Sequence, residues 1–172
     1  VYTNFQVKIV LNTQALVTAG KMQANGSDIR FTDGTCKNLH YWIDSNMNTT
    51  STVIWVKVPS LAASATTTIY MYYGNYCATA AQNGDSTFMF FDDFSTGTYN
   101  TGKWTAYQTT AGSSSIAQTA GKITVSTSGA TDNILRSVNG FTTPFVLDAK
   151  ITGNSGSSPS MAILNNGTFG GV

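Results

Sequence analysis

The sequence has no glutamate, a single histidine, two cysteines and three prolines among 172 residues. Charged residues make up 10% of the chain, against about 25% in an average soluble protein. The net charge is +1. A nearly neutral chain without a basic stripe has no electrostatic basis for binding nucleic acid. No run of about 18 apolar residues occurs, so we expect no membrane-spanning segment.

The missing residue types also argue against an enzyme. Glycoside hydrolysis needs two carboxylates flanking the scissile bond, and only aspartates could supply them here. Asp92 and Asp93 are adjacent, so in a strand they would point to opposite faces. His40 is the one histidine that a serine-type triad could use, and no Gly-x-Ser-x-Gly motif is present. We therefore expect a non-catalytic protein, with His40 on a half-exposed strand.

Hydroxyl and amide side chains replace the missing charges. The chain contains 27 Thr, 17 Ser and 14 Asn, together with 16 Gly. Apolar residues reach 41% and fall in patterned runs, which argues against disorder. Thr, Val and aromatic residues favour strands, and good helix formers never accumulate in one long periodic stretch. This composition predicts an all-β protein with an extracellular or cell-surface location.

The order of apolar residues predicts two antiparallel β-sandwich modules of the jelly-roll type, with at most one or two short helical turns. Residues 1–87 form the first module and residues 88–172 the second. In the first strand, apolar residues alternate from Phe5 to Leu11, which places them on one face. A helical turn follows Asn12. The remaining expected strands are 28–32, 39–43, 52–58 (stopped by Pro59), 67–73, 116–118, 122–126, 134–137, 145–151 and 161–164.

Five blocks of residues resemble a known family. They are 28–33 (DIRFTD), 41–43 (YWI), 53–59 (VIWVKVP), 68–75 (TIYMYYGN) and 83–88 (NGDSTF). In this order they closely resemble the domain of unknown function family 2341, over about residues 3–90. The family occurs in large surface-exposed and secreted proteins of archaea and bacteria. Its biochemical role is unassigned, so the resemblance implies a setting and no specific chemistry.

A second resemblance follows the first. Residues 91–94 (FDDF) and 102–104 (GKW) look like the opening of a concanavalin A-like, or laminin G-like, jelly roll. Members of the first family usually begin with an extra strand ahead of Thr3, and a concanavalin-like domain is normally about twice as long as the stretch after Thr87. Two explanations fit: the sequence is a fragment, or strands from another molecule complete it.

Aromatic residues are the candidate contacts for a carbohydrate ligand. Within the fifth expected strand, Tyr70 and Tyr72 lie on the less aliphatic face, and we take them as the glycan-binding pair. The alternative is that most aromatics of this chain pack in the core. The full set of candidates is Tyr41, Trp42, Trp55, Tyr70, Tyr72, Tyr73 and Trp104.

Three further kinds of site are predicted. Cys36 and Cys77 are an even pair in an exported chain and suggest one disulfide, with free buried thiols as the alternative. Asn25, Asn48 and Asn166 each begin an N-x-Ser/Thr sequon in an expected loop. The resemblance to concanavalin-like domains implies a structural calcium ion at Asp92 or Asp93, against hydrogen-bonded turn aspartates. No other cofactor is expected.

These observations predict a non-catalytic adhesion or glycan-binding module of a larger extracellular surface protein. Its partners would be surface glycans. The alternative is a structural subunit of an extracellular filament or pilus, in which neighbouring copies are joined by β-strand donation. A domain that lacks a strand exposes unpaired backbone groups and an apolar groove, which are a template for strand addition.

Overall fold

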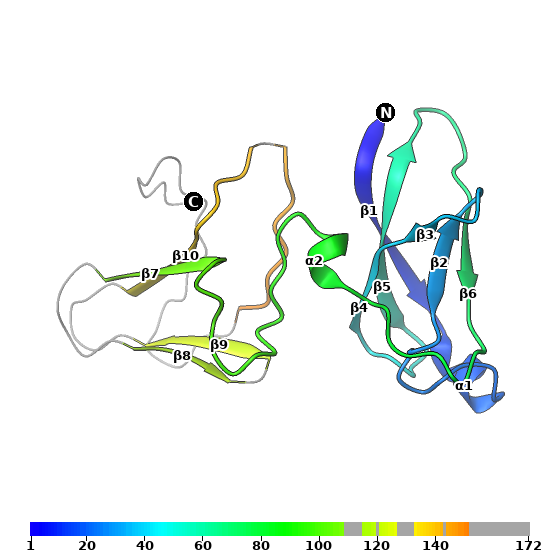
Figure 1. The fold of residues 1–172 in the computed structure, drawn as a ribbon, viewed down its shortest axis with the longest axis horizontal. Coiled ribbons are helices and arrows are strands. Elements are labelled where there is room, and N and C mark those ends of the chain that lie inside the picture. The colour runs from blue at the N-terminus through cyan, green and yellow to red at the C-terminus, as the bar shows by residue number, and fades with distance from the viewer. Residues whose placement is uncertain (109–114, 120, 127–132, 143, 152–172) are drawn as a thin grey trace. The chain divides into compact units, whose positions relative to one another are not determined.

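The computed structural model describes residues 1–108, 115–119, 121–126, 133–142 and 144–151. This part of the chain is mostly β, with two short helices and several small antiparallel sheets (Figure 1). Two compact units can be distinguished: Val1–Tyr99 with Ser115–Ser126, and Asn100–Ser114 with Thr127–Val172. The β-rich class is confirmed, whereas the sandwich arrangement and the module boundary at residue 87 stay predictions. Neither described helix has the length and apolar character to cross a membrane.

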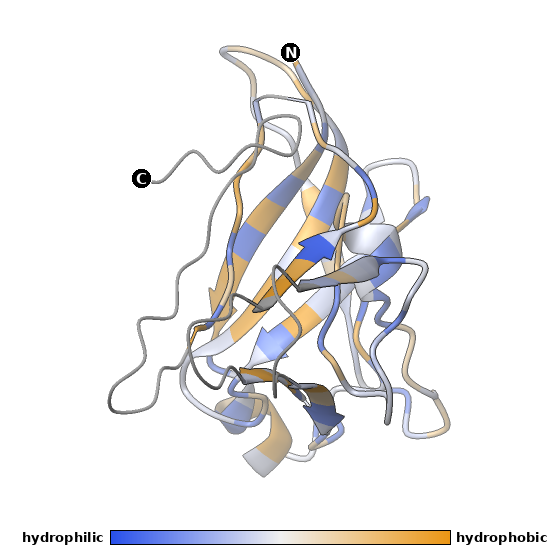
Figure 2. Ribbon diagram, turned by 90° about the vertical axis from the view of Figure 1, so that its left-hand side faces the viewer, coloured by the Kyte–Doolittle hydropathy of each residue, from blue (hydrophilic) through white to orange (hydrophobic). Residues whose placement is uncertain are grey.

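The first sheet of the first unit has the strand order β1-β5-β4. Strand β1 spans Tyr2–Leu11, β5 spans Thr52–Leu61 and β4 spans Tyr41–Ser45. Val7 lies opposite Val56, and Ile9 lies opposite Ile54. Opposite residues of an antiparallel pair share a face, so the predicted apolar face of β1 is confirmed. Hydropathy alternates in bands along these strands in Figure 2.

The second sheet of this unit has the order β3-β2-β6. Strand β2 spans Arg30–Asp33, β3 spans Asn38–Leu39 and β6 spans Ile69–Tyr72. Phe31 lies opposite both Met71 and Leu39. Both sheets therefore contribute to one buried cluster, whose members are Met22, Ile29, Phe31, Leu39, Tyr41, Ile54 and Val56.

Residues 38–45 connect the two sheets, with His40 between β3 and β4. Their first part pairs with β2 as β3, and their second part pairs with β5 as β4. Between these parts, the Lys57 N–H donates to the His40 carbonyl over 2.9 Å, which continues the β4–β5 ladder. The rings of Phe31 and Tyr41, one from each sheet, lie 5.4 Å apart.

The predicted turn after the first strand is confirmed as helix α1, Thr13–Thr18. The Asn12 side chain caps it by accepting from the Ala15 N–H over 3.0 Å. Gly20 follows with a φ of +64°, a left-handed conformation in which glycine is favoured. The sequence signals for this helix, an amide cap and a glycine stop, therefore act as expected.

The predicted stop at Pro59 is wrong, because β5 continues through it to Leu61. The register passes from Thr3–Ser60 to Phe5–Val58 and has no partner pair at Asn4. Asn4 has a φ of +52°. Pro59 lacks an N–H to donate, and it occupies the one position where the ladder is interrupted.

The outer face of the first sheet is covered by aromatic residues that follow helix α2, Gly84–Thr87. The Trp42 ring lies 4.6 Å from that of Phe91, and the Trp55 ring lies 6.0 Å from that of Phe88. Phe88 and Phe91 stack at 5.7 Å. This cover explains why β5 is apolar on both faces.

The remaining strands form two antiparallel pairs. Strands β8 (Ser115–Thr119) and β9 (Lys122–Ser126) pair within the first unit, and β7 (Trp104–Gln108) pairs with β10 (Asn133–Ser137) in the second. The strand predicted at 145–151 is not formed, since 144–151 has no regular secondary structure. The strand predicted at 161–164 lies outside the described residues.

Candidate functional site

Strand β6 divides its side chains between the core and the surface. Ile69 and Met71 pack against the buried cluster. Tyr70 and Tyr72 point the other way, and each is 50% exposed. Tyr70 lies opposite Thr32 and Tyr72 lies opposite Arg30. We call these four residues of β2 and β6 the tyrosine face.

Thr32 has an unusual environment for a threonine on an outer face. It is 7% exposed, and its Oγ1 has no hydrogen-bond partner within the described structure. A buried hydroxyl without a partner costs about 1–3 kcal/mol, and buried polar groups are almost always satisfied. The Thr32 hydroxyl, opposite Tyr70, is therefore an unpartnered group that is closed to solvent.

Arg30 is held in place by three backbone carbonyls. Its Nη1 donates to the Ser27 and Ile29 carbonyls over 2.9 and 2.6 Å, and its Nη2 donates to the Thr79 carbonyl over 2.8 Å. These bonds join β2 to the segment that follows β6. The cation at this end of the tyrosine face is consequently fixed by the fold.

The end of β6 is fastened by a buried carboxylate. Asp28 is 3% exposed. Its Oδ2 accepts from the Gly74 N–H over 2.6 Å, and its Oδ1 accepts from the Gln23 N–H over 3.1 Å. The Tyr76 hydroxyl donates to the Gly20 carbonyl nearby. These contacts hold the strand carrying Tyr70 and Tyr72 in a defined position.

Most of the other aromatic candidates are engaged elsewhere. Tyr41 is buried, and its hydroxyl donates to the Ile29 carbonyl over 2.7 Å. Burial raises the pKa of this phenol above its ordinary value. Trp42 and Trp55 lie under the phenylalanines described above, and the Lys8 Nζ lies 5.7 Å from the Trp55 ring. Of the seven candidates, Tyr70 and Tyr72 present the largest exposed aromatic pair on one strand face.

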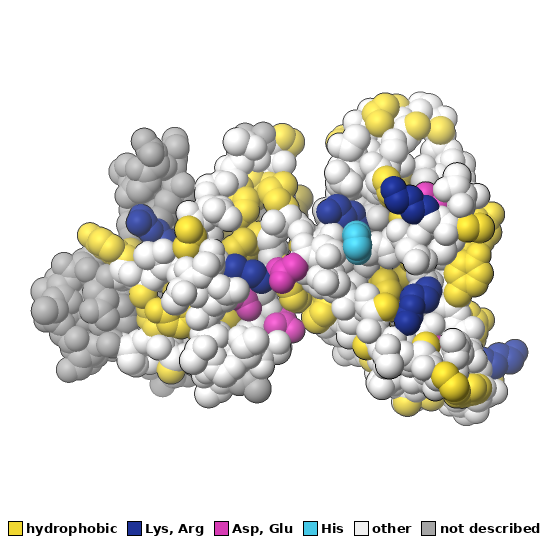
Figure 3. Space-filling view, in the orientation of Figure 1, with side chains coloured by type: hydrophobic (Ala, Val, Ile, Leu, Met, Phe, Trp, Pro, Cys, Tyr) yellow, Lys and Arg dark blue, Asp and Glu magenta, His cyan; other side chains and the backbone are white. Residues whose placement is uncertain are grey.

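Charged side chains make up only 10% of the chain. Figure 3 shows one face of the molecule, on which a few cations and anions are scattered among uncharged side chains. His40 is exposed at the junction of β3 and β4. It borders a hollow of about 280 Å³ together with Asn4, Lys37, Asn38, Leu39, Lys57 and Pro59.

The β2–β3 turn is organised by Asp33. Its carboxylate accepts from the Thr35 hydroxyl over 2.7 Å and from the N–H groups of Thr35 and Lys37 over 2.8 and 3.0 Å. The hydrogen bond from the Thr35 side chain, followed by those from the backbone, lowers the pKa of Asp33 below its ordinary value.

The two cysteines are free and exposed in this structure. Cys36 lies in the turn after β2, close to the Asp33–Ile69 end of the β2–β6 pair, and Cys77 follows the opposite end, where Arg30 meets Tyr72. The Cys36–Cys77 disulfide stays a prediction.

The predicted calcium ligands lie in turns. The Asp92 carboxylate accepts from the Phe94 N–H over 2.9 Å, and the Asp93 carboxylate accepts from the Ser95 N–H over 3.1 Å. Within the described ranges, no three His, Cys, Asp or Glu side chains gather in a way that could hold a metal ion. Calcium binding at Asp92 or Asp93 stays a prediction.

Two of the three sequons lie in described loops. Asn25 and Asn48 are both exposed. The Asn25 Oδ1 accepts from the N–H of Ser27, its own sequon serine, over 3.1 Å. Asn48 has a φ of +61°. Asn166 lies outside the described residues, and glycosylation of all three stays a prediction.

The comparison with protein families agrees with the first resemblance. Residues 25–107 match the model of a family described as a domain of unknown function (DUF2341). No curated protein and no solved structure matches the chain. The DUF2341 region runs from the loop before β2 to β7 and contains the whole tyrosine face. The concanavalin-like resemblance has no corresponding match and stays a prediction.

Sequence reasoning identified the tyrosines of this face and missed the residues beside them. Thr32 and Arg30 belong to the site because β2 pairs with β6, which is more than thirty residues away. The alternation Arg30–Phe31–Thr32 does indicate an outward position for Thr32. Its lack of a hydrogen-bond partner depends on the surrounding packing and leaves no signal in the sequence.

Proposed function

We propose that this protein is a non-catalytic adhesion module of an extracellular surface protein, and that it binds glycans through the tyrosine face. The proposal includes the finer architecture expected from the sequence: a β-sandwich followed by a concanavalin-like β-sandwich. Resemblance to a family found in surface-exposed and secreted proteins supports the location. The pair of half-exposed tyrosine rings on one strand face is the observation that carries the proposal.

The tyrosine face suits a sugar chain in shape and chemistry. Tyr70 and Tyr72 are two residues apart on one strand, so their rings repeat at about 7 Å along it. Aromatic rings offer apolar faces, and tyrosines add a polar tip. The tyrosine hydroxyls can donate to or accept from a sugar hydroxyl. Such an arrangement requires no catalytic group and no cofactor.

Affinity for polysaccharides tests this function. The full chain is screened on a glycan array, and binding to each hit is quantified by calorimetry. Tyr70→Ala and Tyr72→Ala should each weaken binding at least about tenfold, because truncating a central aromatic contact costs more than about 1.4 kcal/mol. Tyr70→Phe and Tyr72→Phe should retain most of the affinity if the ring face makes the contact.

Tyr107→Ala is the matched control. Tyr107 is 52% exposed, as Tyr70 and Tyr72 are at 50%, and it lies on β7 in the second unit. Its truncation should leave glycan affinity unchanged. Absence of binding to any array glycan or cell-surface polysaccharide, or equal losses in the control and the test variants, would refute the proposal.

A further inference from the structure

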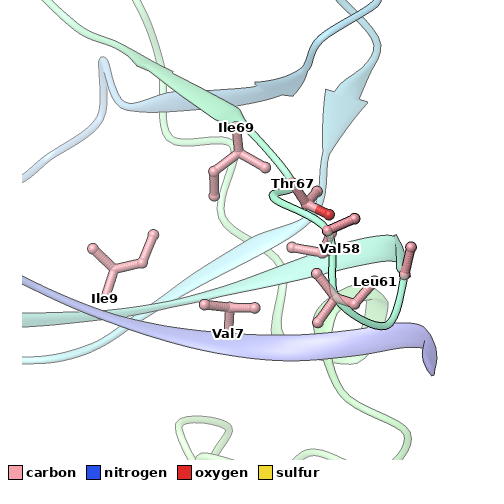
Figure 4. Close-up of a pocket in the computed structure, with 8 residues that line it drawn as sticks. Val7, Ile9, Val58, Leu61, Thr67 and Ile69 are labelled. Carbon is pink, nitrogen blue, oxygen red and sulfur yellow. The ribbon is translucent and has the colours of Figure 1, made fainter. Parts of the chain in front are cut away.

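An open apolar groove of about 510 Å³ lies between β1 and β6. Figure 4 shows Val7 and Ile9 of β1 on one side and Ile69 on the other, with Thr67, Val58 and Leu61 closing the end. No charged residue lines it. The groove connects with the buried cluster, against which Ile9 and Ile69 also pack.

Each strand beside the groove has one edge without a strand partner in the described chain. Strand β1 pairs only with β5, and β6 pairs only with β2. Four antiparallel pairings link β1 to β6: β1 with β5, β5 with β4, β3 with β2, and β2 with β6. Strands β3 and β4 are consecutive parts of one chain segment. Because the direction alternates at each step, β1 and β6 run the same way. A strand added between them would therefore run antiparallel to both and continue the alternation.

The chain itself contains a segment with the pattern of such a strand. Residues 145–151 (FVLDAKI) place Phe145, Leu147, Ala149 and Ile151 on one side of an extended chain. In the structure these residues form no strand. Val146 is 96% exposed, and Leu147 and Ile151 are each 47% exposed. The segment is thus an apolar β-pattern without a sheet to join.

One antiparallel register matches the segment to β1 in both apolarity and charge. With Asp148 opposite Lys8, the apolar residues Leu147 and Ala149 face Ile9 and Val7, which line the groove. On the outer face, Val146 then lies opposite Val10, and Lys150 lies opposite Gln6. A shift of the segment by two residues in either direction separates Asp148 from Lys8, and one of the two shifts places Lys150 opposite Lys8. Like charges directly opposite are destabilising.

We propose that residues 145–151 of one copy insert as a strand into the β1–β6 groove of a second copy, with Asp148 beside Lys8. This goes beyond glycan binding and uses a different surface. Insertion pairs the exposed edge of β1 and covers the groove, in the manner of β-strand addition. Donor and acceptor are different surfaces of the same chain, so the contact is head-to-tail and can propagate.

Charge exchange tests the register. Sedimentation velocity of the full chain should show concentration-dependent association. Lys8→Asp and Asp148→Lys should each weaken it at least about fivefold, and the double variant should recover most of the loss. Both side chains are exposed, and circular dichroism verifies that each variant folds. A monomer at every concentration, or association that neither single variant changes, would overturn the proposal.

Cross-linking between copies tests the same contact directly. In a Cys36→Ser, Cys77→Ser background, a Val7→Cys copy is mixed with an Ala149→Cys copy and oxidised with a disulfide reagent. We expect a mixed disulfide-linked dimer. Lys150→Cys is the control, because this neighbour faces the opposite side of the strand, and it should cross-link far less. Equal cross-linking in both mixtures, or insertion of the segment within its own chain at high dilution, would contradict donation between copies.

Discussion

At the scale of single residues, Gly84 shows how closely the outer face of the first sheet is packed. Gly84 is buried, and a Cβ built on it would lie 2.3 Å from the Phe91 ring. Phe91 in turn packs on Trp42. Gly84→Ala should lower the free energy of unfolding by about 1–3 kcal/mol through overpacking, measured by chemical denaturation. Gly34→Ala is the control, since nothing lies within 4 Å of its Cβ position, and a similar loss there would contradict this explanation.

Thr32 permits a test that separates binding from stability. Its hydroxyl is buried without a partner, so Thr32→Val removes an unsatisfied group and should raise the free energy of unfolding by about 1 kcal/mol. Because the Thr32 Oγ1 is closed to solvent, the same variant should keep its glycan affinity. Thermal unfolding and calorimetry on one preparation give both values. Weaker glycan binding by Thr32→Val would contradict this expectation.

At the scale of elements, two buried threonines join the start of α1 to the start of β5. The Oγ1 atoms of Thr13 and Thr52 lie 2.5 Å apart, and both residues are 0% exposed. Thr52 Oγ1 also donates to the Asn46 carbonyl over 2.7 Å, and Thr13 Oγ1 accepts from the Asn48 N–H over 3.0 Å. The loop before β5 is therefore fixed to the helix by hydroxyl groups instead of ions.

Replacing one of these threonines should loosen that junction. Thr52→Val keeps the side-chain shape and leaves the Asn46 carbonyl and the Thr13 hydroxyl short of a partner, so we expect a loss of about 1–3 kcal/mol in the free energy of unfolding. Thr50→Val, on an exposed residue of the same loop, should change it by less than about 0.5 kcal/mol. Urea denaturation measures the free energy of unfolding of both variants. Equal losses in the two would contradict the role of the buried threonine pair.

The sequence predicted elements well where the determining signal was local. Alternation along β1 identified its core face, and Asn12 with Gly20 marked the ends of α1. The prediction failed where a strand distant in sequence determines the outcome. Pro59 is tolerated within β5 because the ladder with β1 is interrupted at Asn4. The alternation at 145–151 resembles that of β1, yet it forms no strand in the structure. An alternating pattern specifies which side of a strand is apolar, but a strand forms only where a neighbouring strand is present to pair with it.

In the candidate site too, local signals could be predicted and distant strand pairings could not. Exposure of Tyr70 and Tyr72 could be predicted because both occupy the less aliphatic side of one strand. Thr32 could be assigned to the site only after pairing placed it opposite Tyr70. For the cysteines, an even count suggested a bond, and the structure shows both thiols free and exposed. Residue type indicates possible chemistry, and register determines which residues meet.

At the scale of the whole molecule, the first unit depends on a core shared by two small sheets. Tyr41 of β4 lies in this core, contacts the ring of Phe31 from β2 and donates its hydroxyl to the Ile29 carbonyl. The pKa of this phenol is raised above 10 by burial, so the folded state retains the proton more strongly than the unfolded chain does. Stability from this group is complete below about pH 10 and is lost as the pH rises through the folded-state pKa.

We therefore expect the free energy of unfolding to fall at alkaline pH, in a window that begins near pH 10. Chemical denaturation between pH 8 and pH 11 measures this dependence. Tyr41→Phe should be less stable at pH 8, because the hydrogen bond to Ile29 is lost, and its stability should fall less steeply above pH 10. Since the ring links the two sheets, ionisation should weaken the first unit as a whole and affect the β7–β10 pair little. An identical alkaline slope in the wild type and in Tyr41→Phe would show that another group is responsible.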